Sequence, residues 1–143
     1  MKNENTKKNN KGFSLVELIV VIAIMAVLMV VLAPAMLRYV EKSRVQKDDT
    51  AVHEVQRAVE LALSDEAVVD EISGNEVVSV SNQSITMTTG SSPALMTEVH
   101  KTVSDSAVKL SSKTYKGHVY RIQIVSAGTS SGSDGFTVSG SWN

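Results

Sequence analysis

The residue with the most distinctive chemical position in this sequence is Glu17, a lone carboxylate at the edge of a long uncharged stretch. Residues 18–37 contain no charged side chain and no glycine. A carboxylate beside so much apolar surface is costly to bury alone, and much less costly when a cation pairs with it. Ser14 lies three residues earlier, in the S-x-x-E spacing of a capping box at the start of a helix. Glu17 is therefore a helix-capping group, one half of an ion pair, or both.

The other residues that could do chemistry form no recognisable catalytic or metal-binding set. The chain has no cysteine, which excludes disulfides, thiolate metal sites and cysteine nucleophiles. The histidines are scattered and none forms an H-E-x-x-H pair: His53, His100 and His118. Several acids in predicted connectors also lack the spacing of a Ca²⁺-binding loop: Asp65, Glu66, Asp70, Glu71 and Asp134. We therefore expect no enzymatic activity, no bound metal and no cofactor.

The uncharged stretch is the element that must position Glu17. A helix needs about 20 apolar residues to cross the hydrocarbon core of a bilayer, and residues 18–37 have that length. Pro34 lies near the end of this stretch, where its missing N–H and its clash with the preceding turn predict a kink. Residues 1–12 are polar and rich in lysine, so they are interpreted as a leader that holds this end in the cytoplasm. The part of the chain after the stretch is then placed across the membrane or outside.

The charge balance of the chain restricts the kind of molecule that it is expected to bind. The chain carries 14 Lys and Arg against 15 Asp and Glu. Because the leader holds several of the lysines, the remainder of the chain is acidic. An acidic body argues against direct nucleic-acid binding.

The helix is expected to run from Phe13 to about Ser64. Arg38–Thr50 is rich in charge and has no apolar face, so it is predicted to be a solvated helical stalk or a hinge. After it, apolar residues recur at steps of three and four, as on one stripe of an amphipathic helix: Ala51, Val52, Val55, Ala58, Val59, Ala62 and Leu63.

The rest of the chain predicts a small antiparallel sheet with one further helix. Asp65–Gly74 is expected to be an acidic connector. Two β-rich runs around Ser81-Asn82-Gln83 predict a hairpin. Ser92-Pro93 is a typical helix start, and near-helical spacing continues from Leu95 to Leu110. Strict alternation predicts two more strands around a Gly/Ser loop at Ser126–Gly135, with their inward residues at Tyr120, Ile122, Ile124, Phe136 and Val138. The fold class is α+β, a long N-terminal helix packed against a sheet, with the C-terminus held by Phe136, Val138 and Trp142.

The run Lys11-Gly12-Phe13-Ser14-Leu15-Val16-Glu17-Leu18, between a basic leader and an apolar helix, resembles the class III signal of type IV pilins and type II secretion pseudopilins. The resemblance implies that a prepilin peptidase cuts between Gly12 and Phe13 and methylates the new amine of Phe13. It also implies that Phe13 and Glu17 carry subunit assembly, the amine of one subunit pairing with Glu17 of a neighbour. Pro34 matches a proline common in such helices.

The resemblance divides the chain into a cleaved leader (1–12), a transmembrane and filament-core helix (13–37), its amphipathic continuation (38–64) and a globular head (65–143). It implies a structural subunit of a type IV pilus-like filament, first a single-pass protein of the cytoplasmic membrane and then part of an extracellular filament. The implied partners are identical or homologous subunits, prepilin peptidase, membrane lipid, and a membrane assembly platform with its cytoplasmic ATPase.

Two departures from the family pattern and three alternatives accompany this interpretation. The helix has no glycine between Gly12 and Gly74, and the head has no cysteine to pin its C-terminal loop, as in Cys-free pilins that include those of Gram-positive bacteria.

A pseudopilin of a secretion or competence system and a non-polymerising membrane-anchored extracellular domain are both alternatives. A secretory signal is the third, because Ala33-Pro34-Ala35 has the A-x-A form of a signal peptidase site.

Overall fold

The computed structural model describes residues 12–72, 74–126 and 135–143 of the chain. One long helix, α1 (Leu15–Ala62), begins it. The chain divides into two compact units, the first ending at Tyr39 and the second beginning at Val40, so that α1 contributes to both. We call the second unit the head unit and describe it here by itself. The first unit is described with the functional site.

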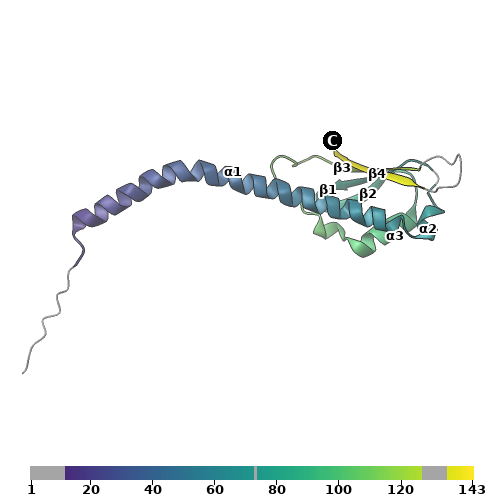
Figure 1. The fold of residues 1–143 in the computed structure, drawn as a ribbon, viewed down its shortest axis with the longest axis horizontal. Coiled ribbons are helices and arrows are strands. Elements are labelled where there is room, and N and C mark those ends of the chain that lie inside the picture. The colour runs from purple at the N-terminus through teal and green to yellow at the C-terminus, as the bar shows by residue number, and fades with distance from the viewer. Residues whose placement is uncertain (1–11, 73, 127–134) are drawn as a thin grey trace, which may run out of the picture. The chain divides into compact units, whose positions relative to one another are not determined.

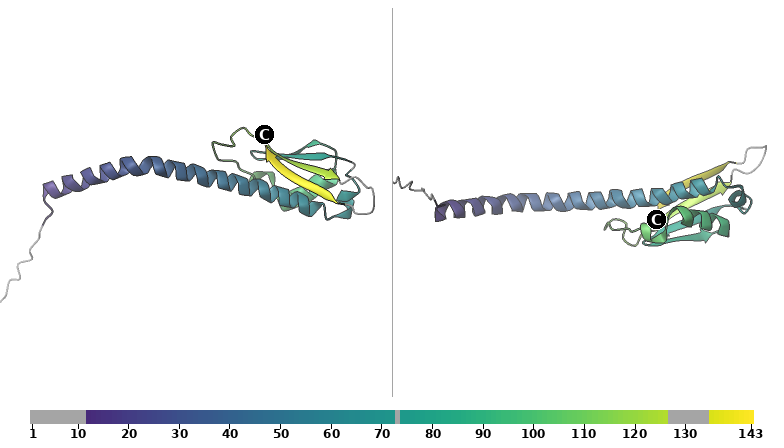
Figure 2. Two further views of the ribbon diagram at one scale, coloured as in Figure 1. Left: turned by 45° about the horizontal axis from the view of Figure 1, so that its top comes forward. Right: turned by 90° about the horizontal axis from the view of Figure 1, so that it is seen from below.

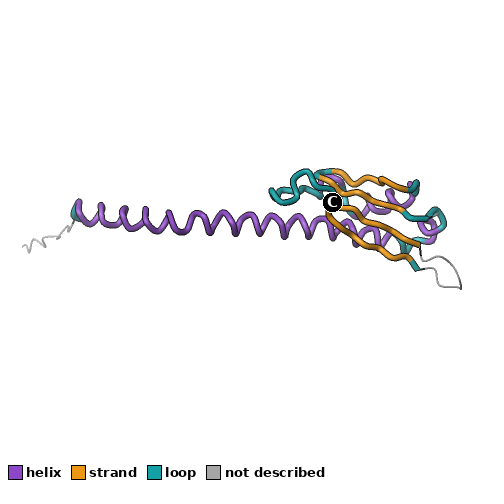
Figure 3. The backbone as a smooth tube through the Cα atoms, turned by 90° about the horizontal axis from the view of Figure 1, so that it is seen from above, coloured by secondary structure: helices purple, strands orange, loops and turns teal. Residues whose placement is uncertain are grey.

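The head unit contains a four-stranded antiparallel sheet (Figures 1 and 3). Its strands are β1 (Glu76–Ser81), β2 (Ser84–Thr89), β3 (Tyr120–Ser126) and β4 (Phe136–Trp142), in the spatial order β2-β1-β3-β4. Strands β1 and β2 are joined by a two-residue turn in which Gln83 has φ 59°. The predicted hairpin and both later strands are confirmed.

One face of the sheet is packed and the other meets solvent. Along β3 the side chains alternate between buried and exposed, as a half-covered strand requires. The second half of α1 and helix α3 (Pro93–Thr102) cover the same face (Figure 2). The predicted stripe of α1 supplies one side of the core with Val52, Val55, Ala58, Val59 and Ala62, and the sheet supplies the other with Val78, Val80, Ile85, Tyr120, Ile122 and Ile124.

One predicted feature of the region after the sheet's first hairpin is wrong. The near-helical spacing up to Leu110 does not continue as helix, because α3 ends at Thr102 and Val103 is extended. The Asp105 carboxylate of the next turn accepts a hydrogen bond from the Ile85 N–H of β2 at 2.8 Å. This contact to a neighbouring strand requires the chain to leave the helix.

The predicted helix start at Ser92-Pro93 is confirmed, with Ser92 as the N-cap of α3 and Pro93 as its first residue. The hydroxyl of Ser92 makes no capping bond and instead donates to the buried carboxylate of Glu76. An orphan N–H of the first turn, that of Ala94, donates to Glu71 Oε2 at 2.7 Å. Glu71 belongs to the predicted acidic connector, which also contains a four-residue helix, α2 (Glu66–Val69), with Asp65 as its N-cap. This second short helix was not predicted.

The predicted solvated stalk is wrong at Asp48, whose side chain is 0% exposed. The Asp48 carboxylate accepts hydrogen bonds from the Ser111 N–H at 2.9 Å and from the Ser112 N–H at 2.8 Å. The Ser111 hydroxyl donates to it as well. About two turns earlier, Glu41 accepts a bond from the Lys113 N–H. Carboxylates of α1 thus hold three successive backbone N–H groups of the loop that leads to β3.

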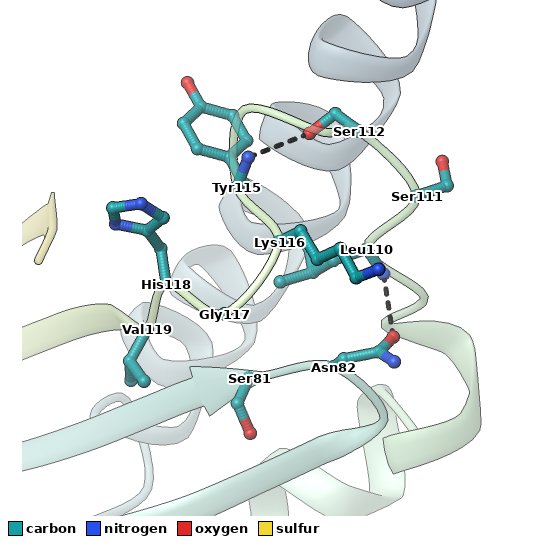
Figure 4. A pocket seen from close by; sticks show the side chains of 10 residues that line it. All are labelled: Ser81, Asn82, Leu110, Ser111, Ser112, Tyr115, Lys116, Gly117, His118 and Val119. Atoms are coloured by element: carbon teal, nitrogen blue, oxygen red, sulfur yellow. Dashed lines mark hydrogen bonds between the residues drawn. The ribbon is translucent and has the colours of Figure 1, made fainter.

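The loop between residues 110 and 119 is also held at its other side (Figure 4). The Leu110 N–H donates to Asn82 Oδ1 at 3.1 Å, and the Tyr115 N–H donates to the Ser112 hydroxyl at 3.2 Å. The loop is therefore fixed between α1 and the β1–β2 turn.

Aromatic packing holds the C-terminus, as predicted for Trp142. The Trp142 ring stacks on Tyr115 with centroids 3.8 Å apart and meets Tyr120 edge-on at 5.1 Å. Its Nε1–H donates to Asp49 Oδ1 of α1 at 3.3 Å. The Tyr120 ring lies so close to Gly140 that a Cβ there would come within 2.1 Å of the Tyr120 hydroxyl oxygen. Only glycine fits opposite this ring.

We expect Asp48→Asn to lower the free energy of unfolding at neutral pH by about 2–4 kcal/mol, because buried N–H groups lose a charged acceptor. Burial raises the pKa of Asp48, but the hydrogen bonds from Ser112 and Ser111 outweigh burial and hold the pKa below its ordinary value of 3.8. The stabilisation is therefore present above about pH 4 and is lost as the pH falls through the lowered pKa. Fluorescence of the single tryptophan, Trp142, during urea unfolding of the full chain in detergent measures it.

The matched control is Glu54→Gln, which changes an exposed carboxylate of the same helix. The wild type and this control should lose stability in acid more steeply than Asp48→Asn. Equal stability of Asp48→Asn and the wild type at pH 7, or parallel acid profiles, would show that the buried carboxylate does not stabilise the head unit.

Candidate functional site

The first part of α1 exposes its apolar side chains all round. Phe13 is 92% exposed, and the large side chains from Leu15 to Leu37 that precede the head unit are exposed as well. Within the described residues, α1 is the one helix long and apolar enough to cross a membrane, and none of its most apolar 18 residues is buried. Water is a poor environment for a surface of this kind, so it requires lipid or other protein around it.

The start of this apolar helix is closed by Ser14 and Glu17. The Ser14 N–H donates to Glu17 Oε2 at 2.9 Å, and the Val16 N–H donates to the Ser14 hydroxyl at 3.4 Å. The predicted capping box is confirmed, except that the Ser14 hydroxyl accepts a hydrogen bond from the Val16 N–H rather than from the Glu17 N–H. The negative charge also lies in the first turn, where the helix dipole favours it. Among the described residues Oε2 alone accepts a hydrogen bond, so they leave the second carboxylate oxygen available to an external cation.

Gly12 lies in an open segment before the helix. A Cβ placed on Gly12 would have no heavy atom within 4 Å, and its φ does not lie in the left-handed region. The described part of the chain therefore gives no internal reason for a glycine at this position, in contrast to Gly140. The peptide bond between Gly12 and Phe13 is exposed on both sides.

Pro34 lies inside α1, which continues through it. The predicted kink at Pro34 stays a prediction.

The histidines are held by structural contacts. His53 meets the Tyr120 ring edge-on at 6.0 Å, His100 Nε2 lies 3.3 Å from Asp105 Oδ1, and His118 Nδ1 lies 2.8 Å from the carbonyl oxygen of Asn143. Among the described residues no group of three or more His, Asp or Glu side chains is arranged to hold a metal ion. Asp134 lies outside the described residues.

The sequence analysis missed the residues of α1 that bind the rest of the head unit, above all Asp48. A signal was present, because Asp48, Val52 and Val55 follow the same spacing of four and three residues. Asp48 therefore extends the buried stripe by one turn, and a carboxylate on a buried stripe indicates a hydrogen-bonded partner.

Comparison with known proteins gives two findings. Residues 7–33 match the family model described as the prokaryotic N-terminal methylation motif. The chain is 35% identical over 80 residues to prepilin peptidase-dependent protein A of Clostridium perfringens (strain 13 / Type A), a match that covers 54% of this chain and 55% of the relative. The chain thus spans about half the length of this curated relative. No solved structure matches the chain significantly.

These findings confirm the predicted resemblance to the type IV pilin and pseudopilin family, through the N-terminal motif and a relative named for its dependence on prepilin peptidase. The long apolar helix and the antiparallel sheet are consistent with a pilin-like α+β fold. The motif and the helix together fit a membrane-anchored protein of the pilin type.

Proposed function

We propose that this chain is a structural subunit of a type IV pilus-like extracellular filament and catalyses no reaction. The observation that carries the proposal is the uncovered apolar part of α1 with one carboxylate at its start, inside a matched N-terminal methylation motif. Lipid covers this surface before assembly, and the helices of neighbouring subunits cover it afterwards. Close packing between helices then replaces their contacts with lipid.

Gly12 and Phe13 are the proposed processing site. Prepilin peptidase cuts the bond between them on the cytoplasmic side and methylates the new amine of Phe13. The openness of Gly12 supports this proposal, because a glycine that the chain's own packing does not require suits the tight site of a peptidase.

Glu17 and Phe13 are the proposed assembly pair. The free oxygen of Glu17 in one subunit accepts the cationic amine of Phe13 in its neighbour, inside the apolar core of the filament. A carboxylate in hydrocarbon costs several kcal/mol unless it is paired, so a subunit docked in the wrong register is penalised. The ion pair therefore acts mainly on register, and the apolar contact supplies the affinity.

A membrane assembly platform with its cytoplasmic ATPase extracts the processed subunits from the cytoplasmic membrane. The head units form the outside of the filament on the cell surface. A pseudopilin of a type II secretion or competence system is the alternative, because it would have the same N-terminal motif and apolar helix. The two are distinguished by the length of the filament that the subunits form. A long pilus is shed in bulk when cells are sheared, whereas a pseudopilus or a plain anchor is not.

The proposed function predicts where the mature chain begins. The protein isolated from its own cell envelope should begin at Phe13 and carry one added methyl group, because cleavage creates the amine that assembly uses. Intact mass and N-terminal sequencing measure both. A chain beginning at Met36 would indicate a cleaved secretory signal, and an intact Met1 a plain membrane anchor, and either result would contradict the proposal.

The second prediction separates the charge of Glu17 from its capping role. Glu17→Ala removes both, whereas Glu17→Gln keeps an oxygen that can accept the Ser14 N–H and removes the charge. We expect both variants to be cleaved and both to lower the yield of sheared filaments about tenfold or more, because the amine of the neighbour loses its partner.

Ser14→Ala is the matched control, since it removes the hydroxyl that caps Val16 and leaves the charge of Glu17 in place. Its filament yield should stay near that of the wild type. A normal yield from Glu17→Gln would show that Glu17 only caps the helix, and the ion-pair proposal would then be abandoned.

A further inference from the structure

Three exposed cations of the head unit lie at the start of its share of α1. Lys42, Arg44 and Lys47 are exposed there, and we call these three residues the basic segment. The carboxylates of the same stretch are engaged inside the head unit: Glu41 and Asp48 hold the loop at 111–113, and Asp49 holds Trp142. Within the part of the chain that the structure describes, Arg44 alone of the three has a charge partner nearby, Glu41 at 3.8 Å, and its side chain is still 48% exposed.

The opposite end of the same helix is acidic. Glu60, Asp65, Glu66 and Asp70 are all exposed, and the sequence contains no lysine or arginine between Glu60 and Asp70. These carboxylates surround the end of α1 and the start of α2. The head unit's share of α1 therefore begins with three exposed cations, and exposed carboxylates predominate from Glu60 onward.

A shallow hollow of about 450 Å³ lies at this acidic end. Leu61 and Ala62 form part of its wall, and Asp65, Glu66 and Glu98 bring carboxylates to it. The chain's own Lys101 is bound to Glu98 and is also attracted by Asp65, so Glu66 is the carboxylate of the three that has no cation near it among the described residues. Leu61 is 62% exposed although it is a large apolar side chain. The exposed Leu61 side chain beside the Glu66 carboxylate fits a lysine or arginine, whose aliphatic stem packs on carbon while its charged group binds the carboxylate oxygens.

The basic segment cannot reach this hollow within one chain. Lys47 and Ala62 are separated by about 22 Å along a helix that rises 1.5 Å per residue. A second copy displaced along the helix axis brings the two surfaces together. All copies anchored in one membrane point the same way, because the basic leader keeps each N-terminus in the cytoplasm. The contact is then head-to-tail, and a contact of that kind propagates without closing.

We infer that the basic segment of one copy docks in the acidic hollow of the next, with a lysine stem against Leu61 and its ammonium group on Glu66. This contact between head units rests on the proposed function, since it adds a second, polar interface to the helix packing of the same filament. It sets the axial order of the copies on the outside of the filament, as Glu17 sets it inside.

The chain has no cysteine, so disulfide cross-linking tests the contact without background. The double variant Lys47→Cys with Glu66→Cys, treated with a mild oxidant in cells, should give a ladder of covalent multimers. Each single variant should give none. Lys109→Cys with Glu66→Cys is the matched control, because Lys109 is an exposed lysine outside the basic segment. A ladder no stronger than that of this control would overturn the inference, as would dimers from Lys47→Cys alone.

Charge reversal tests the chemistry of the same contact. Lys47→Glu and Glu66→Lys should each lower the yield of sheared filaments about threefold, since a favourable pair becomes repulsive. The two changes combined should restore the yield. Lys109→Glu with Arg121→Glu should leave the yield unchanged. Failure of the combined variant to recover would overturn the inference.

Two further outcomes are distinguishable. If Lys47→Glu releases the full chain from phosphatidylglycerol vesicles and the combined variant does not recover filaments, the basic segment contacts lipid and the inference is wrong. If wild-type cells shed no filaments, the proposed function fails by itself. A cysteine ladder in their membranes would then still establish the contact between copies, and its absence would refute both.

Discussion

The head unit depends on the burial of one stripe of α1 against one face of the sheet. Val52, Val55 and Val59 are each 0% exposed, and so are Ile122 and Ile124 on β3, an inner strand of the sheet. The other face of β3 meets solvent, so the sheet has no second layer among the described residues. Without this half of α1 the buried face would lose most of its cover, with a cost of roughly 1.5–3 kcal/mol for each large side chain exposed. The helix is therefore part of the core of the head unit as well as the continuation of an apolar segment.

Polar contacts decide where along α1 the rest of the head unit is fixed. Apolar packing is not directional, and a stripe of valines and alanines gives little information about register. The carboxylate of Asp48 does specify the register, because its oxygens must lie within hydrogen-bond distance of the N–H groups of Ser111 and Ser112. Asp49 with Trp142, and Gln56 with the Tyr120 hydroxyl at 3.1 Å, add further fixed points along the helix. A buried carboxylate without these donors would be strongly unfavourable, so a displaced arrangement is penalised.

The same helix presents two different surfaces to its surroundings. Up to Leu37 its side chains are apolar and exposed, which leaves the hydrophobic effect unsatisfied in a single copy. Beyond Val40 most of the apolar residues are covered by the chain itself, and the exposed residues are largely charged or polar. The uncovered part contains most of the residues that match the N-terminal methylation motif, and in the function proposed above this part would serve assembly while the covered part carries the head unit. The carboxylate of Glu17 is the one charged group in the described start of the uncovered part, where its capping bond to Ser14 leaves an oxygen for another molecule.

The sequence by itself determined the features that depend on local spacing. The uncharged residues 18–37, the Ser14–Glu17 pair, the three-and-four spacing from Val52 to Ala62 and the alternation at Tyr120, Ile122 and Ile124 all predicted elements that the structure contains. Only the tertiary structure decided features whose partners are distant in sequence. Asp48 is buried because Ser111, 63 residues later, supplies its donor, and a charged residue in a charged stretch gave the opposite prediction. Likewise α3 ends at Thr102, before the predicted Leu110, because the Asp105 carboxylate accepts a hydrogen bond from Ile85 of β2. The Ser92 hydroxyl donates to Glu76 and makes no capping hydrogen bond to its own helix. Local periodicity reports which face of an element is buried, whereas a polar side chain takes whichever partner the folded chain brings to it.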